Sequence, residues 1–174
     1  MKKILLGLIL IIFYNCSVTN TENSLTSIQK DKKTNVSFDF AGTVETTDID
    51  FLKKNYNWND ERILIINYSQ PISSCHFNNN TNSESSKKWW ENFYSKINTE
   101  NCKNIKVLSN GERVKGKLDN IKYFDDKDDF LLKKFFDRKK SCFGVLVINT
   151  DGDYIQFNGH YSERQVARFI EFLR

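Results

Sequence analysis

The residues with the clearest chemical potential in this chain are its four cysteines, Cys16, Cys75, Cys102 and Cys142. Thiols form disulfides, exchange them, or bind soft metal ions such as copper and zinc. No two of these cysteines have C-x-x-C spacing, which excludes a zinc ribbon. Cys75 is followed directly by His76, so a thiol and an imidazole are adjacent. The chain could therefore support either disulfide or metal chemistry.

A metal site built on Cys75 and His76 would need Cys142 as a third ligand, with His160 as a further candidate of unknown position. The number and spacing of these ligands fall short of what zinc sites use. A partly exposed loop histidine is the simpler interpretation of His76. We therefore expect no metal ion and no other cofactor. No Ser-His-Asp set, phosphate loop or carboxylate pair can be assembled either.

An acidic run, Asp125–Asp129 (DDKDD), could be taken for calcium ligands. It lacks the fixed ligand spacing of calcium-binding loops. Carboxylates are also favoured at the start of a helix, where they complement the positive end of the macrodipole. Basic residues follow toward and just beyond the end of a predicted helix 127–138, namely Lys133, Lys134, Arg138, Lys139 and Lys140. This distribution of charge favours a helix start over a calcium site.

The N-terminal sequence, MKKILLGLILIIFYNC, has the pattern of an export signal. Lys2 and Lys3 precede the uninterrupted apolar run Ile4–Phe13. A membrane-spanning helix needs roughly 20 apolar residues, so this shorter run fits the core of a secretory signal. We therefore predict that residues 1–15 are a signal peptide and that the protein works outside the cytoplasm.

Cys16 directly follows this segment, and the arrangement resembles a bacterial lipoprotein, in which such a cysteine is lipidated and becomes the new N-terminus. The preceding residues Phe13, Tyr14 and Asn15 depart from the usual lipobox of leucine and small residues. An uncleaved anchor and cleavage at another site are the alternatives. The resemblance implies a lipoprotein anchored in the bacterial cell envelope through Cys16, facing the periplasm or the exterior.

Loss of residues 1–15 removes two lysines and no acids, so the formal net charge falls from +4 to +2. A nearly neutral chain lacks the concentrated basic footprint of nucleic-acid-binding proteins, so we expect no nucleic-acid partner. Residues 16–35 are polar beyond the cysteine and lack apolar periodicity, which indicates a flexible tether. Residues 36–174 are long enough for one domain with a sizeable core.

Hydrophobic patterns after the tether alternate between strands and helices. Strand patterns occupy residues 36–40, 62–68, 104–108 and 143–148, with a short extra strand at 121–124. The continuous run ILII within 62–68 is typical of a strand buried on both faces. Helical patterns occupy residues 48–56, 84–97 and 127–138. Such alternation predicts parallel strands joined by right-handed crossovers.

The last third of the chain has the clearest pattern. Asp151 and Gly152 mark a tight hairpin turn after the strand at 143–148, and a strand at Tyr154–Phe157 follows. Ser162 is an N-cap candidate for a final helix whose apolar residues recur at helical spacing, at Val166, Phe169, Ile170 and Leu173. The sequence therefore predicts an antiparallel hairpin and a closing helix.

With the element order β-α-β-α-β-α-β-β-α, residues 36–174 resemble a thioredoxin-like domain. The resemblance is carried by ILIINYSQPISSC, which is similar to the family's central strand and active-site loop, and by FGVLVINTDGDYIQFNGHYSERQVARFIEFL, which is similar to its closing hairpin and last helix. The chain looks most like small, uncharacterised members without the redox motif. This implies an α/β fold, a three-layer sandwich around a central mixed sheet with a terminal β-hairpin and a C-terminal helix.

The resemblance places residues 72–75 (ISSC) where the family carries its C-x-x-C motif. Ile72 then occupies the position of the nucleophile and cannot attack a disulfide, whereas Cys75 keeps the resolving position. Phe143, preceded by Cys142, takes the place of the family's cis-proline. Both departures imply a catalytically degenerate protein without ordinary disulfide oxidoreductase activity.

The resemblance also implies a disulfide. In the family, the residue before the cis-proline lies against the active-site loop, so Cys142 is expected beside Cys75 and Cys102 at the opposite edge of the sheet. Three cysteines follow Cys16, and an oxidising compartment allows at most one bridge among them. We predict that Cys75 and Cys142 form a structural staple and leave Cys102 free. The alternative is a redox-switchable pair.

Together these features predict an envelope-anchored binding or accessory module that contacts a membrane through its lipid and has an unidentified protein partner. A thiol-redox or metal-handling protein that uses Cys75 and Cys142 is the first alternative. The second is a protein that binds and neutralises a toxin in the envelope. Size and export permit that role, although no residue argues for it.

Overall fold

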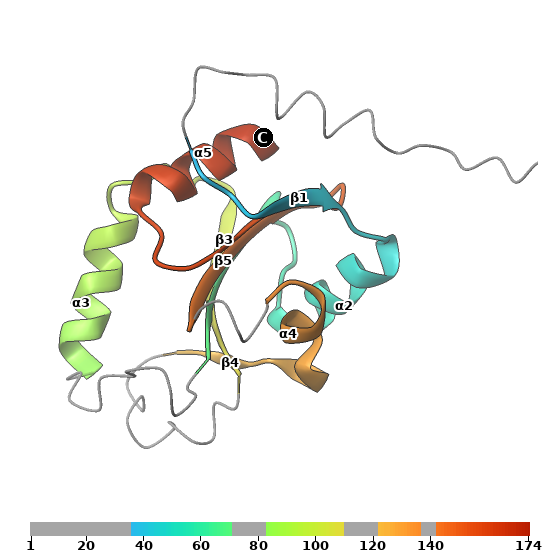
Figure 1. Cartoon of the computed structure of the whole chain (residues 1–174), viewed down its shortest axis with the longest axis horizontal. Helices are drawn as coiled ribbons and strands as arrows, with labels where there is room; N and C mark the ends of the chain where they lie inside the picture. The colour runs from blue at the N-terminus through green and yellow to red at the C-terminus, as the bar shows by residue number, and fades with distance from the viewer. Residues whose placement is uncertain (1–35, 71–82, 110–121, 137–141) are drawn as a thin grey trace, which may run out of the picture. The chain divides into compact units, whose positions relative to one another are not determined.

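The computed structural model of the protein describes residues 36–70, 83–109, 122–136 and 142–174 (Figure 1). Their strands form a six-stranded sheet with the order β1-β6-β5-β2-β3-β4. The strands are β1 (Phe40–Thr43), β2 (Ile63–Ser69), β3 (Cys102–Leu108), β4 (Phe124–Asp125), β5 (Phe143–Asn149) and β6 (Asp153–Asn158). The helices are α2 (Thr46–Tyr56), α3 (Ser83–Tyr94), the 3-10 turn η4 (Lys127–Asp129), α4 (Phe130–Lys134) and α5 (Glu163–Leu173).

The central strands form the mixed sheet that the resemblance implies, whereas the alternating pattern alone predicted parallel strands up to the hairpin. β2 and β3 are parallel and follow one another along the chain with α3 between them. β5 is antiparallel to β2, and β6 is antiparallel to β5. The spatial strand order β6-β5-β2-β3, with α5 after β6 along the chain, is that of a thioredoxin-like α/β domain. The predicted fold class is therefore confirmed.

Two short strands extend this centre at its edges. β1 pairs antiparallel with β6, whereas β4 pairs parallel with β3 over only two positions, Val107↔Phe124 and Leu108↔Asp125. Among the described residues, no strand covers the outer side of β3 from Cys102 to Lys106. Within the described ranges, this part of the sheet edge therefore lacks a strand partner.

Helices cover both faces of the sheet, with α2 and α4 on one side and α3 and α5 on the other (Figure 1). Alternate residues of β2 serve the two layers: Leu64 and Ile66 pack toward α2 and α4, and Ile63 and Ile65 pack toward α3 and α5. Successive strand residues point to opposite faces, so a strand covered on both faces needs a continuous apolar run. The ILII run of β2 meets that requirement.

Gly144 of β5 permits a close approach in the layer that contains α2 and α4. A Cβ atom at this position would lie 2.5 Å from Cε1 of Phe136. The Phe136 ring stacks on Tyr68 of β2, with centroids 4.2 Å apart and planes inclined by 2°. The absence of a side chain at Gly144 thus lets the aromatic pair lie directly against the sheet.

The first predicted strand is displaced, because β1 begins at Phe40 rather than at Val36. Contact with β6 starts at Asp39, whose N–H donates to the Gln156 carbonyl at 2.9 Å. Val36 and Phe38 lie half-buried against the layer of α3 and α5. The alternating pattern at the start of this segment therefore reflects side-chain packing rather than strand pairing.

The helix predicted over residues 127–138 is much shorter. α4 ends at Lys134, and it starts only at Phe130 because Asp128 and Asp129 adopt left-handed conformations with φ of 57° and 53°. A right-handed helix cannot continue through left-handed residues. α3 also ends earlier than predicted, at Tyr94 rather than Ile97. Both predictions had the right type of element and the wrong length.

The C-terminal predictions are confirmed. The Ser162 hydroxyl accepts from the N–H of Gln165, and the Gln165 side chain accepts from the N–H of Ser162, so the two residues form a capping box at the start of α5. Gly152 has a φ of 94° in the turn before β6. α5 buries the four predicted residues Val166, Phe169, Ile170 and Leu173.

The predicted signal peptide, Cys16 and the tether lie outside the described residues. Within the described ranges, no helix is long and apolar enough to cross a membrane. Export and lipid anchoring therefore stay predictions.

Candidate functional site

Cys142 directly precedes β5 and lies beside the C-terminal end of β2, the central strand. Phe143 pairs with Ser69 at the last position of β2, and the N–H of Gln70 donates to the Cys142 carbonyl at 2.8 Å. Cys142 is disulfide-bonded. Cys75 lies outside the described residues, as do Ile72 and His76, so the Cys75–Cys142 pairing stays a prediction.

Cys102 lies at the other end of the same strands. It begins β3 and pairs with Ile63, the first residue of β2. Its thiol is free and donates to the Glu100 carbonyl at 3.4 Å, and burial raises its pKa above the usual value of 9.0. A raised pKa leaves less thiolate at neutral pH, so Cys102 is a poor nucleophile.

His160 lies beside Phe143, with ring centroids 5.3 Å apart, and its side chain is exposed. It is thus close to the Cys142 end of β5. In the part of the chain that the structure describes, no group of three or more His, Cys, Asp or Glu side chains could hold a metal ion.

The acidic run Asp125–Asp129 contains one buried carboxylate, that of Asp126. It accepts hydrogen bonds from the Tyr68 hydroxyl at 2.7 Å and from the N–H groups of Leu131 and Leu132, each at 2.9 Å. Burial raises the pKa of Asp126, although these hydrogen bonds oppose the change. Asp126 therefore binds the first amides of α4, whereas Asp128 and Asp129 form the turn before it.

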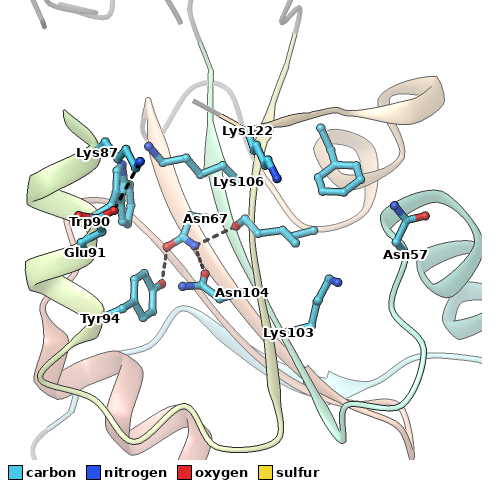
Figure 2. Close-up of a pocket in the computed structure, with 12 residues that line it drawn as sticks. Asn57, Asn67, Lys87, Trp90, Glu91, Tyr94, Lys103, Asn104, Lys106 and Lys122 are labelled. Carbon is cyan, nitrogen blue, oxygen red and sulfur yellow. Dashed lines mark hydrogen bonds and ion pairs between the residues drawn. The ribbon is translucent and has the colours of Figure 1, made fainter. Parts of the chain in front are cut away.

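A cleft of about 730 Å³ opens along the outer edge of β3 (Figure 2). α3 forms one wall, and the end of α2 and the start of β4 lie on the other side. The lining residues are Asn57, Asn67, Lys87, Trp90, Glu91, Tyr94, Lys103, Asn104, Ile105, Lys106, Lys122 and Phe124. Four of them are consecutive in β3, because the cleft follows the strand edge and meets side chains from both faces.

Asn67 of β2 fixes the base of the cleft through a polar network. Its amide nitrogen donates to Oδ1 of Asn104 at 2.7 Å and to the Ile105 carbonyl at 2.9 Å. Its Oδ1 accepts from the hydroxyls of Tyr94 at 2.5 Å and Tyr161 at 2.8 Å. Burial raises the pKa of both tyrosines, so each hydroxyl keeps its proton and acts as a donor. The network joins β2 and β3 to α3 and to the residue before the α5 cap.

Lys106 is the most unusual residue of the cleft. Its side chain runs from β3 toward α3, and its Nζ lies 4.3 Å from the centroid of the Trp90 ring (Figure 2). The side chain is half-buried, and burial lowers its pKa from the usual 10.5 to about 8. The Trp90 ring gives it a cation–π contact. Among the described residues, no carboxylate forms an ion pair with Lys106.

The other lysines of the cleft differ in their partners. Lys87 lies 3.9 Å from a Glu91 oxygen, and Lys103 lies 3.7 Å from a Glu61 oxygen. Lys122 has no carboxylate partner in the described ranges, and Figure 2 shows it reaching into the cleft from the side opposite α3. In the part of the chain that the structure describes, Lys106 and Lys122 are therefore positive charges at the strand edge without a carboxylate partner.

Sequence reasoning missed this cleft. An asparagine directly after the apolar run of β2 was one signal, because a buried amide needs partners. A lysine within the NIKVL strand pattern was another. Neither signal predicts that Trp90, Lys106 and Lys122 line one cleft. They do so only because α3 and β4 pack on either side of the β3 edge.

Two solved structures are similar to this chain. StoA from Bacillus subtilis aligns with a TM-score of 0.44 and 15% identity, covering 64% of this chain and 84% of that one. A secreted Mycobacterium tuberculosis disulfide oxidoreductase homologous to E. coli DsbE aligns with a TM-score of 0.40 and 10% identity, covering 65% of this chain and 83% of that one. No family model and no curated protein matches the sequence.

Proposed function

We propose that the protein is an exported, lipid-anchored binding module that does not catalyse thiol–disulfide exchange, and that the cleft along β3 is its ligand site. The observation that carries the proposal is Lys106, a half-buried lysine that lacks a carboxylate partner among the described residues and faces Trp90. Its charge is incompletely solvated. An anionic group in the cleft would compensate that charge, so the ligand is expected to be anionic.

The fixed polar base supports a binding role. A site binds more tightly when its groups are already held in place, because less conformational freedom is lost on binding. Asn67 is held by four hydrogen bonds, and Trp90 packs on Tyr94 with ring centroids 6.0 Å apart and planes inclined by 16°. The amides and the aromatic wall are therefore preorganised before a ligand enters.

The binding proposal is tested with small anions. Isothermal titration of the full chain with inorganic pyrophosphate or citrate is expected to show binding, and spermidine, a cation, is expected to show none. Lys106→Gln should weaken anion binding about tenfold, the effect of losing one charge-assisted contact. Lys88→Gln is the matched control, because Lys88 lies on α3 outside the cleft with a 74% exposed side chain. Equal affinity in both variants would place the anion elsewhere.

A thiol-redox role is the second candidate, because Cys142 is disulfide-bonded at the end of the central strand. The proposal predicts that the full chain in detergent fails to speed the reduction of insulin by dithiothreitol. Turnover that disappears in a Cys75→Ser variant would refute the non-enzymatic role. The predicted anchor is tested separately by labelling cells with radioactive palmitate, where Cys16→Ser should lose the label.

A further inference from the structure

The backbone at the edge of β3 offers hydrogen-bonding groups to a ligand. The Ser109 N–H donates to the Ser69 carbonyl of β2, whereas the Leu108 carbonyl accepts from the Asp126 N–H on the opposite side. The amide groups of successive strand residues alternate between the two sides. Asn104 and Lys106 therefore direct their amide groups outward like Leu108, and Ile105 directs its groups toward β2.

β4 leaves part of this edge uncovered. It pairs with β3 only at Val107 and Leu108. Within the described ranges, the outward N–H and C=O of Asn104 and the N–H of Lys106 have no strand partner. Unpaired groups at a sheet edge are a template for a further strand. Because the cleft is lined by the consecutive residues Lys103–Lys106, its floor is this edge.

We propose that an acidic, extended segment of a protein partner adds to β3 as a further strand and places carboxylates against Lys106 and Lys122. The inference rests on the proposed function and names its ligand class. Strand addition supplies affinity through main-chain hydrogen bonds, and side-chain contacts supply selectivity. Here the selective contacts are the two lysines without carboxylate partners among the described residues, at the rim of the cleft.

The charges at the edge also decide against a second copy of this chain. Two copies of β3 paired at this edge would bring Lys103, Lys106 and the nearby Lys122 of each copy together, and like charges across strands are destabilising. Edge lysines commonly prevent such self-pairing. The carboxylates of an acidic strand would instead attract these lysines. The occupant is therefore expected to be acidic.

Peptides of ten residues test the proposal with the full chain in detergent. The probe alternates glutamate and threonine, and its charge control alternates lysine and threonine. Two further glutamate probes carry N-methyl groups on alternate amides, one on the odd and one on the even residues. The probe that faces β3 with its methylated edge should bind about tenfold more weakly, because the hydrogen bond to the Asn104 carbonyl is lost and the methyl groups hold the peptide away from the strand.

Backbone exchange gives an independent readout. Hydrogen exchange followed by NMR should show that the glutamate peptide slows the amides of Asn104 and Lys106. The Ile105 amide is the internal control, because it already faces β2 and should change little. Protection of the two outward amides together with the loss caused by N-methylation would support strand addition.

The outcomes separate the inference from the proposed function. Equal binding of all three glutamate peptides, or no added protection at Asn104 and Lys106, would overturn strand addition. If pyrophosphate then still binds and still depends on Lys106, the cleft is an anion site and the proposed function survives. If neither the peptides nor the small anions bind, both proposals fail. Preference for the lysine peptide would also overturn the inference.

Discussion

Asn67 directly follows the apolar run of the central strand β2, and its side-chain amide is fully hydrogen-bonded. Only 2% of the residue is exposed, and every polar atom of its side chain has a partner. A buried amide without such partners would cost about 1–3 kcal/mol. The residue therefore fixes the distance between the sheet and α3, and with it the depth of the cleft.

We predict that Asn67→Leu lowers the free energy of unfolding by about 2–4 kcal/mol, because the hydroxyls of Tyr94 and Tyr161 lose their acceptor. Tyr94→Phe should cost only about 1 kcal/mol, because Tyr161 still donates to Asn67. Urea unfolding followed by far-UV circular dichroism measures both values. A smaller effect for Asn67→Leu than for Tyr94→Phe would show that the network does not stabilise the fold.

Lys106 leads to a prediction about pH. Its pKa is about 8 in the folded chain and 10.5 in the unfolded chain, so between these values the unfolded chain holds one more proton. The free energy of unfolding therefore rises with pH across this window. In Lys106→Met that contribution disappears. We expect Lys106→Met to have a higher free energy of unfolding than the parent at pH 7, and this difference to shrink steadily as the pH rises from about 8 to 10.5. Urea titrations at several pH values measure the difference, and parallel pH curves for the two proteins would contradict this prediction.

At the scale of the elements, β2 and α5 followed the sequence more closely than α4 did. β2 and α5 carry continuous or periodic apolar patterns with clear ends, so both their type and position could be predicted. α4 could not, because its start depends on Asp128 and Asp129 being left-handed and on the Asp126 carboxylate turning inward to its amides. These conformations and hydrogen bonds depend on tertiary packing, so a local charge pattern does not predict them.

The contact between β5 and α4 gives a prediction at this scale. Gly144→Ala should lower the free energy of unfolding by about 1–3 kcal/mol, because the new methyl group would overlap Phe136 and disturb its stacking on Tyr68. Alanine has a higher strand propensity than glycine, so propensity alone predicts that Gly144→Ala raises the free energy of unfolding. Gly42→Ala in β1 is the control, since its Cβ would approach no atom closer than 3.3 Å. Thermal unfolding distinguishes the two substitutions.

At the scale of the whole molecule, the fold could be predicted and the cleft could not. Alternating elements and the closing hairpin predict the fold class and the pairing of β5 with β6, but not the antiparallel pairing of β5 with β2. The cleft instead depends on where β4 begins, at Phe124, and only two residues of that strand pair with β3. A strand longer by a few residues would cover Asn104 and Lys106. Element ends are the least certain part of a sequence-based prediction, so a site defined by them escapes it.

The cysteines give a prediction for the molecule as a whole. Cys142 is disulfide-bonded at one end of β2, and Cys102 is free at the other. Cys142→Ser should lower the free energy of unfolding by about 2–4 kcal/mol, because a cross-link restricts the unfolded chain. Cys102→Ser should cost about 1 kcal/mol or less. Similar losses in the two variants would mean that the bridge contributes no stability.

The aromatic residues of α3 give the cleft an intrinsic spectroscopic signal. Trp89 and Trp90 are in edge-to-face contact with centroids 4.8 Å apart, and Trp90 continues through Phe93 to Tyr161 beside α5. Indoles held at such a fixed angle couple their strong electronic transitions, so the pair is expected to add two bands of opposite sign to the circular dichroism spectrum in the far ultraviolet. Because the Lys106 ammonium lies 4.3 Å from the centroid of the Trp90 ring, a change in its charge is expected to shift the emission of that indole. Trp90 is thus an intrinsic chromophore in the cleft that a ligand would enter, and Trp89 is coupled to it.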